Sequence, residues 1–404
     1  MNLLVLLTSS FPYGTGEEFL LNELNYIRGF DRVVICPCGV KPGSKQTKPL
    51  KNGIECFPVS YERKRFGYAE VILNRHVVSE IAELIGAGRF SIGRVHELLF
   101  FSKNAVNIFH SLKNLPDLEK ADRVTIYSYW FYDGAAAGAL FKDYLLKCGK
   151  SVRLISRAHG FDIHAERAKY GYLPLRRFLV KHCDGVFPCS SDGSGILKKQ
   201  FPAYGGKIRM AHLGTKDHGI KYGSRNGFRI LSCSYMVPVK RLHLIAEALK
   251  NTDFPVIWTH LGSGPLENEL KAAAKELPKC VKCEFKGSME NSDVMNYYKN
   301  NNISVFVNVS SSEGIPVSIM EACSFGIPVI ATDVGGTHEI VQNGENGFLL
   351  TPDFSATEFL DKLNLIKDME DEAYTKMCEK SRSIWSDKFS AEKNYSEFYE
   401  VLGK

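Results

Sequence analysis

The chain has 404 residues, of which 44% are hydrophobic and 24% charged; this composition excludes a fibrous or disordered protein, and the length favours two globular domains. Its formal net charge of +6 suits anionic phosphates or an anionic membrane face. We expect no nucleic-acid partner, because the sequence holds no motif for one. The start has no basic segment, no apolar stretch approaches the ~20 residues that span a bilayer, and the cysteines are scattered, which predicts a cytoplasmic protein with reduced thiols.

Short apolar strands alternate with helical patterns through the first half of the chain. Helical periodicity covers Phe19–Ile27 and Gly134–Lys147. The expected strands are Leu3–Leu7, Val33–Cys36, Val124–Tyr127, Val152–Ser156 and Gly185–Cys189. This alternation predicts a doubly wound, Rossmann-like sheet of parallel strands. We therefore expect an N-terminal domain over residues 1–216.

A glycine-bearing turn follows the first expected strand. Gly14 and Gly16 precede a helix, and glycine allows the backbone to approach a phosphate or a sugar closely. Phe19 interrupts the Gly-x-Gly-x-x-Gly pattern of nicotinamide-binding turns, and the sequence has no P-loop. A purely structural turn remains the alternative.

Residues 61–115 differ from the rest of the N-terminal domain. Their pattern is mostly helical, is broken near Gly86–Gly93, and mixes phenylalanines with basic residues. The basic residues are Arg63, Lys64, Arg65, Arg75, Arg89, Arg94, Lys103 and Lys113. Basic amphipathic helices lie on membranes or contact anionic lipid. A peripheral membrane contact and a solvated helical excursion that covers the first sheet both stay open.

A polar motif follows another expected strand end in the same domain. His159 lies beside Gly160, with Asp162 two residues further on. At the carboxyl end of a strand, a histidine can bond a reacting sugar or its phosphate. The alternative is a buried histidine with a structural role.

A polar, glycine-bearing linker, Asp217–Asn226, separates the first alternation of strands and helices from a second one. The strands expected in the second half are Arg229–Ser234, Val256–Leu261, Cys283–Lys286, Ile303–Val309, Pro328–Ala331 and Gly347–Leu350. Two such alternations predict two Rossmann-like domains that face a central cleft, the second over residues 227–386. Residues 387–404 hold an aromatic amphipathic helix, which we expect to pack back on the first domain.

Several strand-to-helix turns of the second half carry basic residues or glycines. Lys240 and Arg241 follow the first strand, where a cation can clamp a diphosphate and stabilise it as a leaving group. Gly262 and Gly264 follow the second strand, and Gly335–Gly336 form a third glycine turn. Any one of these turns is a weak signal, whereas their combination in one domain predicts a phosphate site.

The most informative stretch is 308–321. An apolar strand ends there in a serine cluster, Glu313 lies in the glycine turn, and Pro316 marks a helix start. Helix N-termini present free N–H groups and a positive dipole end, which form an anion site. Glu321 follows on the first turns of the helix. Two carboxylates beside a phosphate site predict a neutral polyol joined to the phosphate, as in a nucleotide sugar; two solvated glutamates are the alternative.

Together these motifs resemble the family-4 retaining glycosyltransferases of the GT-B fold, also called glycosyl transferases group 1. The resemblance covers nearly the whole chain and is most specific over Phe285–Asp353. The start of the chain is similar to capsule and exopolysaccharide members. The resemblance implies that Glu313 contacts the hydroxyls of the donor sugar and that Glu321 binds the ribose.

Further donor-side roles follow from the same resemblance. It implies that the backbone of Gly314, Val317 and Ser318 meets the pyrophosphate, and that Lys240 contacts the diphosphate. The remaining residues that it implies are Gly262, Gly264, Gly16, the active-site His159 and, as a second positive charge, Arg241. Family members commonly carry an arginine where this chain has Tyr235.

The sequence therefore predicts a retaining glycosyltransferase, which moves a sugar from a nucleotide-diphosphate donor to an acceptor hydroxyl in polysaccharide or glycolipid biosynthesis. The partners are the nucleotide-sugar donor, which we expect the second domain to bind, and a saccharide or lipid-linked acceptor, which we expect the first domain to bind. We expect no cofactor and no metal, because the sequence has no Asp-x-Asp motif and Cys280-x-x-Cys283 lacks a second pair. A nucleotide-sugar epimerase and a non-catalytic subunit that binds nucleotide sugar are the alternatives.

Overall fold

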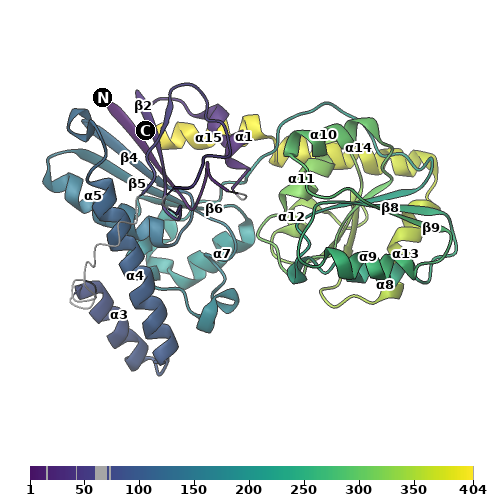
Figure 1. Ribbon diagram of the computed structural model, residues 1–404, viewed down its shortest axis with the longest axis horizontal. Helices are drawn as coiled ribbons and strands as arrows, with labels where there is room; N and C mark the ends of the chain where they lie inside the picture. Colours follow the sequence, from purple (N-terminus) through teal and green to yellow (C-terminus); the bar gives the residue numbers. More distant parts are fainter. Residues whose placement is uncertain (15–16, 42, 60–70, 72–73, 404) are drawn as a thin grey trace. The chain divides into compact units, whose positions relative to one another are not determined.

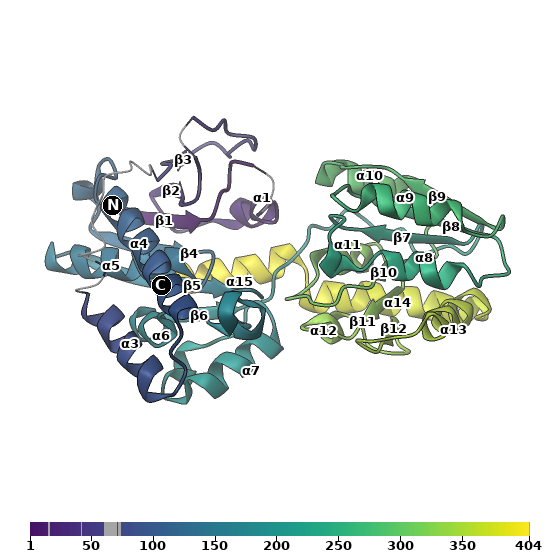
Figure 2. The same ribbon diagram turned by 60° about the horizontal axis from the view of Figure 1, so that its bottom comes forward.

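The computed structural model describes residues 1–14, 17–41, 43–59, 71 and 74–403. The chain divides into two compact units (Figures 1 and 2). Unit 1 contains Met1–Ala211 and Tyr395–Lys404, and unit 2 contains His212–Asn394. Each unit is built around a six-stranded sheet, and all the strand pairings are parallel.

The sheet of unit 1 has the order β3-β2-β1-β4-β5-β6. Its strands are β1 (Asn2–Thr8), β2 (Arg32–Pro37), β3 (Ile54–Cys56), β4 (Arg123–Ser128), β5 (Ser151–Ala158) and β6 (Gly185–Pro188). The sequence predicts five of these. It misses β3, a half-exposed edge strand too short to show any alternation. The predicted helix over Phe19–Ile27 is only one turn of α-helix, α1 (Leu20–Glu23), followed by the 3-10 turn η1 (Leu24–Tyr26).

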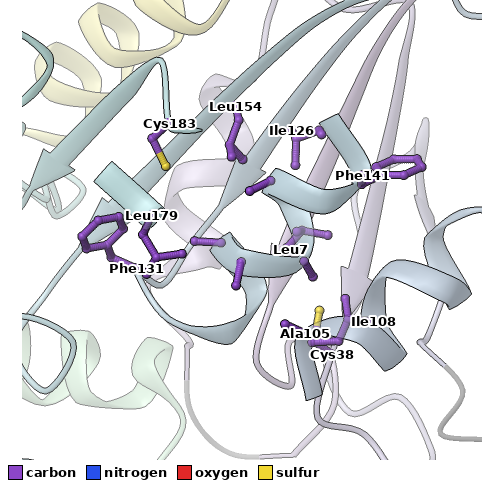
Figure 3. Close-up of a cluster of buried hydrophobic side chains, with 14 of the residues drawn as sticks. Leu7, Cys38, Ala105, Ile108, Ile126, Phe131, Phe141, Leu154, Leu179 and Cys183 are labelled. Carbon is purple, nitrogen blue, oxygen red and sulfur yellow. The ribbon is translucent and has the colours of Figure 1, made fainter. Parts of the chain in front are cut away.

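Alternate residues of the strands form the core on one face of this sheet. Leu3, Val5 and Leu7 of β1 point to the same side as Ile126 of β4 and Leu154 of β5. Helices cover this face, and Figure 3 shows Leu7, Ile126, Phe141 and Leu154 gathered with Ala105 and Ile108. The helices of unit 1 are α3 (Arg75–Gly86), α4 (Ile92–Leu112), α5 (Asp133–Lys147), α6 (Arg176–His182) and α7 (Ser191–Gln200).

The described part of the basic excursion, α3 and α4, packs onto this domain. Leu98, Phe101, Ala105 and Ile108 of α4 are buried in the core. The first basic residues of the excursion, Arg63 to Arg65, lie outside the described residues. Among the residues that the structure describes, no helix combines the length and the apolar character needed to cross a membrane.

The opposite face of the sheet packs against the C-terminal helix α15 (Ala391–Gly403), whose residues from Tyr395 onward belong to unit 1. The ring of Phe398 contacts Tyr127 and Phe187 at centroid distances of 5.4 and 5.3 Å. Beneath these rings Arg157 and Glu23 form a fully buried ion pair of 3.7 Å. Tyr127 donates to Glu23 (2.7 Å) and accepts from Arg157 Nε (2.9 Å), so both charges have polar partners. Arg157, the next-to-last residue of β5, therefore serves the attachment of α15.

We expect that Glu23→Ala lowers the free energy of unfolding by about 3–5 kcal/mol, because it leaves the buried guanidinium of Arg157 without its counter-charge. Glu400→Ala is the matched control, since it breaks the exposed Arg28–Glu400 pair that joins the same helix and should cost less than about 1 kcal/mol. Urea unfolding followed by circular dichroism measures both. Equal effects of the two substitutions would contradict the expectation.

The sheet of unit 2 has the order β12-β11-β10-β7-β8-β9. Its strands are β7 (Arg229–Cys233), β8 (Val256–Leu261), β9 (Val281–Phe285), β10 (Val305–Asn308), β11 (Val329–Thr332) and β12 (Gly347–Leu350). All six are predicted from the sequence to within a few residues. Its helices are α8 (His243–Leu249), α9 (Glu267–Lys275), α10 (Asn291–Asn300), α11 (Val317–Ser324), α12 (Thr337–Ile340), α13 (Ala356–Lys367) and α14 (Asp371–Lys388).

Alternate residues of the strands also form the core of unit 2, together with the helices that cover them. Ile230, Val305 and Val307 are buried with apolar residues of α8 and α13, for example Ile245 and Leu363. Helix α11 contacts β10 and β11 and packs against α14. The doubly wound parallel sheets predicted from the alternating pattern are thus present in both units.

Candidate functional site

The strand order of unit 2 reverses between β10 and β7, so consecutive elements leave the sheet in opposite directions at this point. Ligands of open α/β sheets bind at such a switch point, beyond the carboxyl ends of the strands. The loop after β7 carries Lys240, and the loop after β10 carries Glu313. The fold therefore brings together two predicted residues that are 73 positions apart.

Lys240 and Glu313 form an ion pair at this edge. Nζ of Lys240 lies 2.7 Å from Oε1 of Glu313. Asn308, the last residue of β10, donates through Nδ2 to the same oxygen at 3.2 Å. The side chain of Lys240 is 25% exposed and that of Glu313 12%, so solvent and ligands reach the pair. Asn308 was not assigned a role from the sequence, although a polar residue at the end of an apolar strand is a recognisable signal.

Arg241 fixes the loop that carries Lys240. Its guanidinium donates to the carbonyl oxygens of Val309 (2.9 Å), Ser310 (3.3 Å) and Pro352 (2.8 Å). These bonds join the loops after β7, β10 and β12. The structure thus directs the donors of Arg241 at loop carbonyls, beside Lys240 but not toward its partner Glu313.

The N-terminus of α11 lies directly after Glu313. Pro316 is the N-cap residue, so Val317 and Ser318 form the first turn, in which N–H groups have no acceptor within the helix. Gly335 of the neighbouring loop lies so close that an added Cβ would be 2.0 Å from the carbonyl oxygen of Glu313. Gly336 N donates to the carbonyl oxygen of Gly314 at 2.7 Å. The third glycine turn therefore buttresses the loop that holds Glu313.

Gly262 and Gly264 likewise allow close backbone packing, here against the loop after β7. A Cβ on Gly262, whose φ is +133°, would lie 2.0 Å from the carbonyl oxygen of Ser234, and one on Gly264 would lie 2.5 Å from that of Met236. Beneath this loop His260 is fully buried and hydrogen-bonds to Ser234 O through Nε2 (3.1 Å). Ser232 Oγ bonds to its Nδ1 (2.8 Å). A buried network thus supports the loop that leads to Lys240.

Glu321 lies apart from the ion pair, one turn further along α11. It is buried, and Oε1 accepts a hydrogen bond of 2.7 Å from Nδ2 of Asn291, the first residue of α10. Asn291 comes from the segment after β9. The second carboxylate of the pair therefore lies away from Lys240, and its partner is Asn291, to whose side chain the sequence assigned no role.

Two of the predicted site residues, Gly16 and His159, belong to the first half of the chain. Gly16 lies outside the described residues. His159 is buried and stacks on Tyr129 at 4.7 Å between centroids. Its Nε2 lies 3.1 Å from the carbonyl oxygen of Tyr129, which only accepts, so Nε2 carries the hydrogen. Burial, with the nearby Arg157 charge, lowers the pKa of His159 to about 3, and the ring is neutral at pH 7.

Asp162 joins the loops after β4 and β5. Its carboxylate accepts from the backbone N–H groups of Phe131 (2.9 Å) and His159 (2.7 Å). This carboxylate thus holds His159 beside the aromatic residues that follow β4. The aspartate of the predicted polar motif is a positioning residue for the histidine.

Unit 1 also contains a cavity of about 650 Å³ at its own switch point, between β1 and β4. Residues that follow these strands line it, with Asn104 of α4 and Phe161 of the loop after β5. The lining includes Ser9, Glu17, Phe19, Trp130, Tyr132 and Asp133. Among the lining residues, Trp130, Tyr132 and Asp133 were not predicted from the sequence, although the aromatic run Tyr129–Tyr132 lies between a strand and Asp133–Gly134 and carries a detectable signal. Among the described residues, no cluster of His, Cys, Asp and Glu side chains is placed to hold a metal ion.

Comparisons with known proteins agree with this geometry. Residues 220–384 match the family Glycosyl transferases group 1. The chain carries a glycosyl transferases group 1 domain. That domain contains the Lys240–Glu313 pair and Glu321, and it begins within the predicted linker.

Individual relatives are distant. The putative colanic acid biosynthesis glycosyltransferase WcaL of Salmonella typhimurium is 26% identical over 204 residues, which cover 48% of this chain and 50% of WcaL. The chain spans about half the length of the WcaL proteins of Salmonella typhimurium and Escherichia coli that it matches. N-acetyl-alpha-D-glucosaminyl L-malate synthase of Bacillus anthracis is 22% identical over 394 residues. The aligned residues cover 87% of this chain and 97% of that enzyme.

A solved structure places the fold. Anabaena Alr3699/HepE, solved in complex with UDP and glucose, superimposes with a TM-score of 0.67 at 16% identity, covering 99% of each chain. The two six-stranded parallel sheets with their surrounding helices are those of the GT-B glycosyltransferases. The predicted GT-B fold class is confirmed, and the resemblance to glycosyl transferases group 1 is confirmed over residues 220–384.

The buried His260 gives a test of the network under the Lys240 loop. We expect His260→Phe to lower the free energy of unfolding by about 1–3 kcal/mol at pH 7, because the carbonyl oxygen of Ser234 loses its donor and the hydroxyl of Ser232 keeps only Trp258. Burial lowers the folded-state pKa of His260 to about 4, from about 6.5 in the unfolded chain. Its stabilising contribution is therefore complete above pH 6.5 and is lost as the pH falls toward 4. Urea unfolding at pH 7 and pH 5 should show the deficit of the variant shrinking at pH 5.

The control for this measurement is His243→Phe, on the exposed surface of α8, which should change stability at pH 7 by less than about 0.5 kcal/mol. A deficit of His260→Phe that grows at pH 5 would contradict the network.

Proposed function

We propose that this protein is a retaining glycosyltransferase that uses a nucleotide-diphosphate sugar and acts in polysaccharide or glycolipid biosynthesis. The observation that carries the proposal is the Lys240–Glu313 pair next to the N-terminus of α11, because it combines a cation, a carboxylate and free N–H groups at one switch point. Two comparisons support the same chemistry. WcaL is named as a putative glycosyltransferase, and HepE is solved in complex with UDP and glucose.

In this proposal the diphosphate lies against the N–H groups of Gly314, Val317 and Ser318. Lys240 turns from Glu313 to the phosphate, and Arg241 adds positive potential while holding the Lys240 loop. Glu313 then accepts hydrogen bonds from hydroxyls of the transferred sugar. Glu321, fixed by Asn291, takes the ribose hydroxyls. Gly262 and Gly264 leave the backbone exposed on the phosphate side.

The reaction breaks the bond between the anomeric carbon and the phosphate oxygen, and the electron pair goes to the phosphate. The acceptor oxygen bonds to the same face of the anomeric carbon, which keeps the configuration, and its proton passes to the leaving phosphate. Lys240 and the α11 N-terminus stabilise the charge that develops there. We propose that no metal is needed, because these groups supply positive charge. Neutral His159 acts as a hydrogen-bonding group at the donor, since its low pKa excludes a charged imidazolium.

The proposed role of Glu313 is tested by Glu313→Ala in the purified protein. We expect turnover with a panel of nucleotide sugars and glycoside acceptors to fall at least ~100-fold, because the sugar loses its hydrogen-bond acceptor, while the unfolding transition is retained. The measurement is release of nucleoside diphosphate. The matched control is Glu372→Ala on the exposed surface of α14, which should leave turnover unchanged.

Near-normal turnover of Glu313→Ala would contradict the site. Release of an isomerised donor in the absence of an acceptor would indicate an epimerase instead of a transferase. Absence of binding and turnover across the whole panel would favour the non-catalytic subunit.

We also propose a peripheral contact with anionic lipid through the α3–α4 region. Val78 and Ile85, one heptad apart on α3, are exposed, as are Phe90 in the turn that follows and Ile92 at the start of α4. Arg75 and Arg89 are exposed on the same segment. Apolar side chains rimmed by arginines are typical of surfaces that enter the headgroup region. Such a contact would suit a lipid-linked acceptor.

The lipid contact is tested with the double substitution Phe90→Asp and Ile92→Asp. We expect binding to vesicles that contain phosphatidylglycerol to fall at least ~5-fold, because two apolar anchors are replaced by charges that the lipid repels. Co-sedimentation measures it, with vesicles of phosphatidylcholine alone for comparison. Ile220→Asp, an exposed apolar residue of unit 2, is the control and should keep binding. Unchanged binding of the double variant would refute the contact.

A further inference from the structure

The cavity of unit 1 has walls of two chemical kinds. One wall is aromatic: Trp130 and Phe161 lie 4.9 Å apart between ring centroids, and Tyr132 meets Phe161 at 5.7 Å. Phe161 is 49% exposed although it is a large apolar side chain. Exposed aromatic rings that line a cavity are characteristic of ligand sites. The C–H face of a sugar ring packs well on such rings, because both surfaces are apolar and flat.

The other wall is polar and acidic. Asp133 accepts a hydrogen bond of 2.9 Å from the N–H of Gly134 and a long one of 3.4 Å from Nδ2 of Asn104. The weak bond to Asn104 leaves both groups with capacity for a ligand hydroxyl, since a carboxylate has several acceptor positions and an amide has both donors and an acceptor. Ser9 and Ser128 add hydroxyl groups to the lining.

Glu17 brings a second carboxylate to the cavity, but its oxygens are already occupied. They accept from the backbone N–H groups of Ser9 (2.8 Å), Ser10 (2.7 Å) and Phe11 (2.8 Å) and from Nε1 of Trp130 (2.6 Å). Glu17 thus fixes the turn after β1 and the orientation of the Trp130 ring. The aromatic wall is held in place before a ligand arrives, which lowers the entropy cost of binding.

The charges of the lining have one sign. Among the described residues that line the cavity, two are carboxylates and none is a lysine or an arginine. A negatively charged ligand would enter a partly desolvated space beside two carboxylates and meet no counter-charge from those residues. The phosphate site of unit 2 differs, since it carries Lys240 and a helix N-terminus.

We propose that this cavity binds the acceptor as a neutral sugar ring, stacked on Trp130 and Phe161 and hydrogen-bonded to Asp133 and Asn104, and that it rejects an acceptor sugar carrying a carboxylate. The proposal rests on the proposed function, since it takes the ligand of the cavity to be the acceptor. Asp133 and Phe161 are its specificity-determining residues: Phe161 supplies the stacking surface, and Asp133 supplies both a hydroxyl partner and the excluding charge.

The experiment compares methyl glycosides with the uronic acids that differ from them only at C6, in matched gluco, galacto and manno pairs. Binding to the full chain is measured without any donor, by ligand-observed NMR and calorimetry. We expect at least one neutral glycoside to bind about tenfold or more tightly than its acid partner, because the acid meets unpaired like charge. Equal affinity within every pair, or no binding by any neutral glycoside, would overturn the proposal.

Two substitutions separate the roles of the walls. Phe161→Ala should weaken the neutral glycoside about fivefold or more, and Phe161→Trp should restore it, because the stacking surface returns. Phe161 is half exposed, so folding should survive both changes. Leu365→Ala, which changes an equally exposed apolar residue of α13 outside the cavity, is the control and should bind normally. Unchanged binding by Phe161→Ala would refute the aromatic wall.

Asp133→Asn keeps the size and hydrogen-bonding capacity of the side chain but removes its charge. We expect the neutral glycoside still to bind and its advantage over the acid to shrink several-fold. An unchanged ratio would refute the excluding role of Asp133. Failure of the proposed function would look different, because nucleoside diphosphate release would be absent while saccharide binding without donor persisted.

Discussion

The constraint on which the rest of this protein depends is the order of its parallel strands. In each unit the order reverses at one place, between β1 and β4 in unit 1 and between β7 and β10 in unit 2. Loops on either side of such a point diverge and leave space between them. The cavity of unit 1 and the Lys240–Glu313 pair of unit 2 lie at these two places.

Around its switch point, unit 2 uses close backbone packing and side-chain hydrogen bonds to hold a few polar groups in position. In unit 2, glycines at 262, 264 and 335 allow loops to approach so closely that any Cβ would collide with a carbonyl oxygen. Arg241 joins three loops by bonds to their carbonyls, and His260 supports one of them from beneath. Because these contacts are short and specific, Lys240 and Glu313 stand on a fixed frame.

The two units use opposite electrostatics at equivalent places. Unit 2 offers positive potential from Lys240 and the α11 N-terminus, which suits a diphosphate. The described lining of the cavity in unit 1 offers aromatic rings and two carboxylates, which suits a neutral polyol. In the proposed reaction, one substrate carries most of the negative charge and the other supplies only a hydroxyl. Such a division lowers the competition of either ligand for the site of the other.

Most strands of the fold and several residues of the candidate site could be predicted from the sequence. Hydrophobic periodicity predicted eleven of the twelve strands, because buried parallel strands are continuous apolar runs; β3 escaped as a three-residue edge strand. The motifs after β7 and β10 predicted Lys240 and Glu313 as candidate site residues, and the structure brings the two side chains together. By contrast, the sequence predicts Arg241 only as a second positive charge, and its bonds to the carbonyl oxygens of Val309, Ser310 and Pro352 are evident only in the structure.

The sequence by itself therefore determined the layers of the fold and the family to which its second half belongs, because both depend on local patterns along the chain. Only the tertiary structure decided which polar groups are free to act and which hold others in place. Asp133 and Asn104 meet from two helices, and Asn291 reaches Glu321 across 30 residues. Such pairings arise from packing between distant segments, and no periodicity in the chain records them.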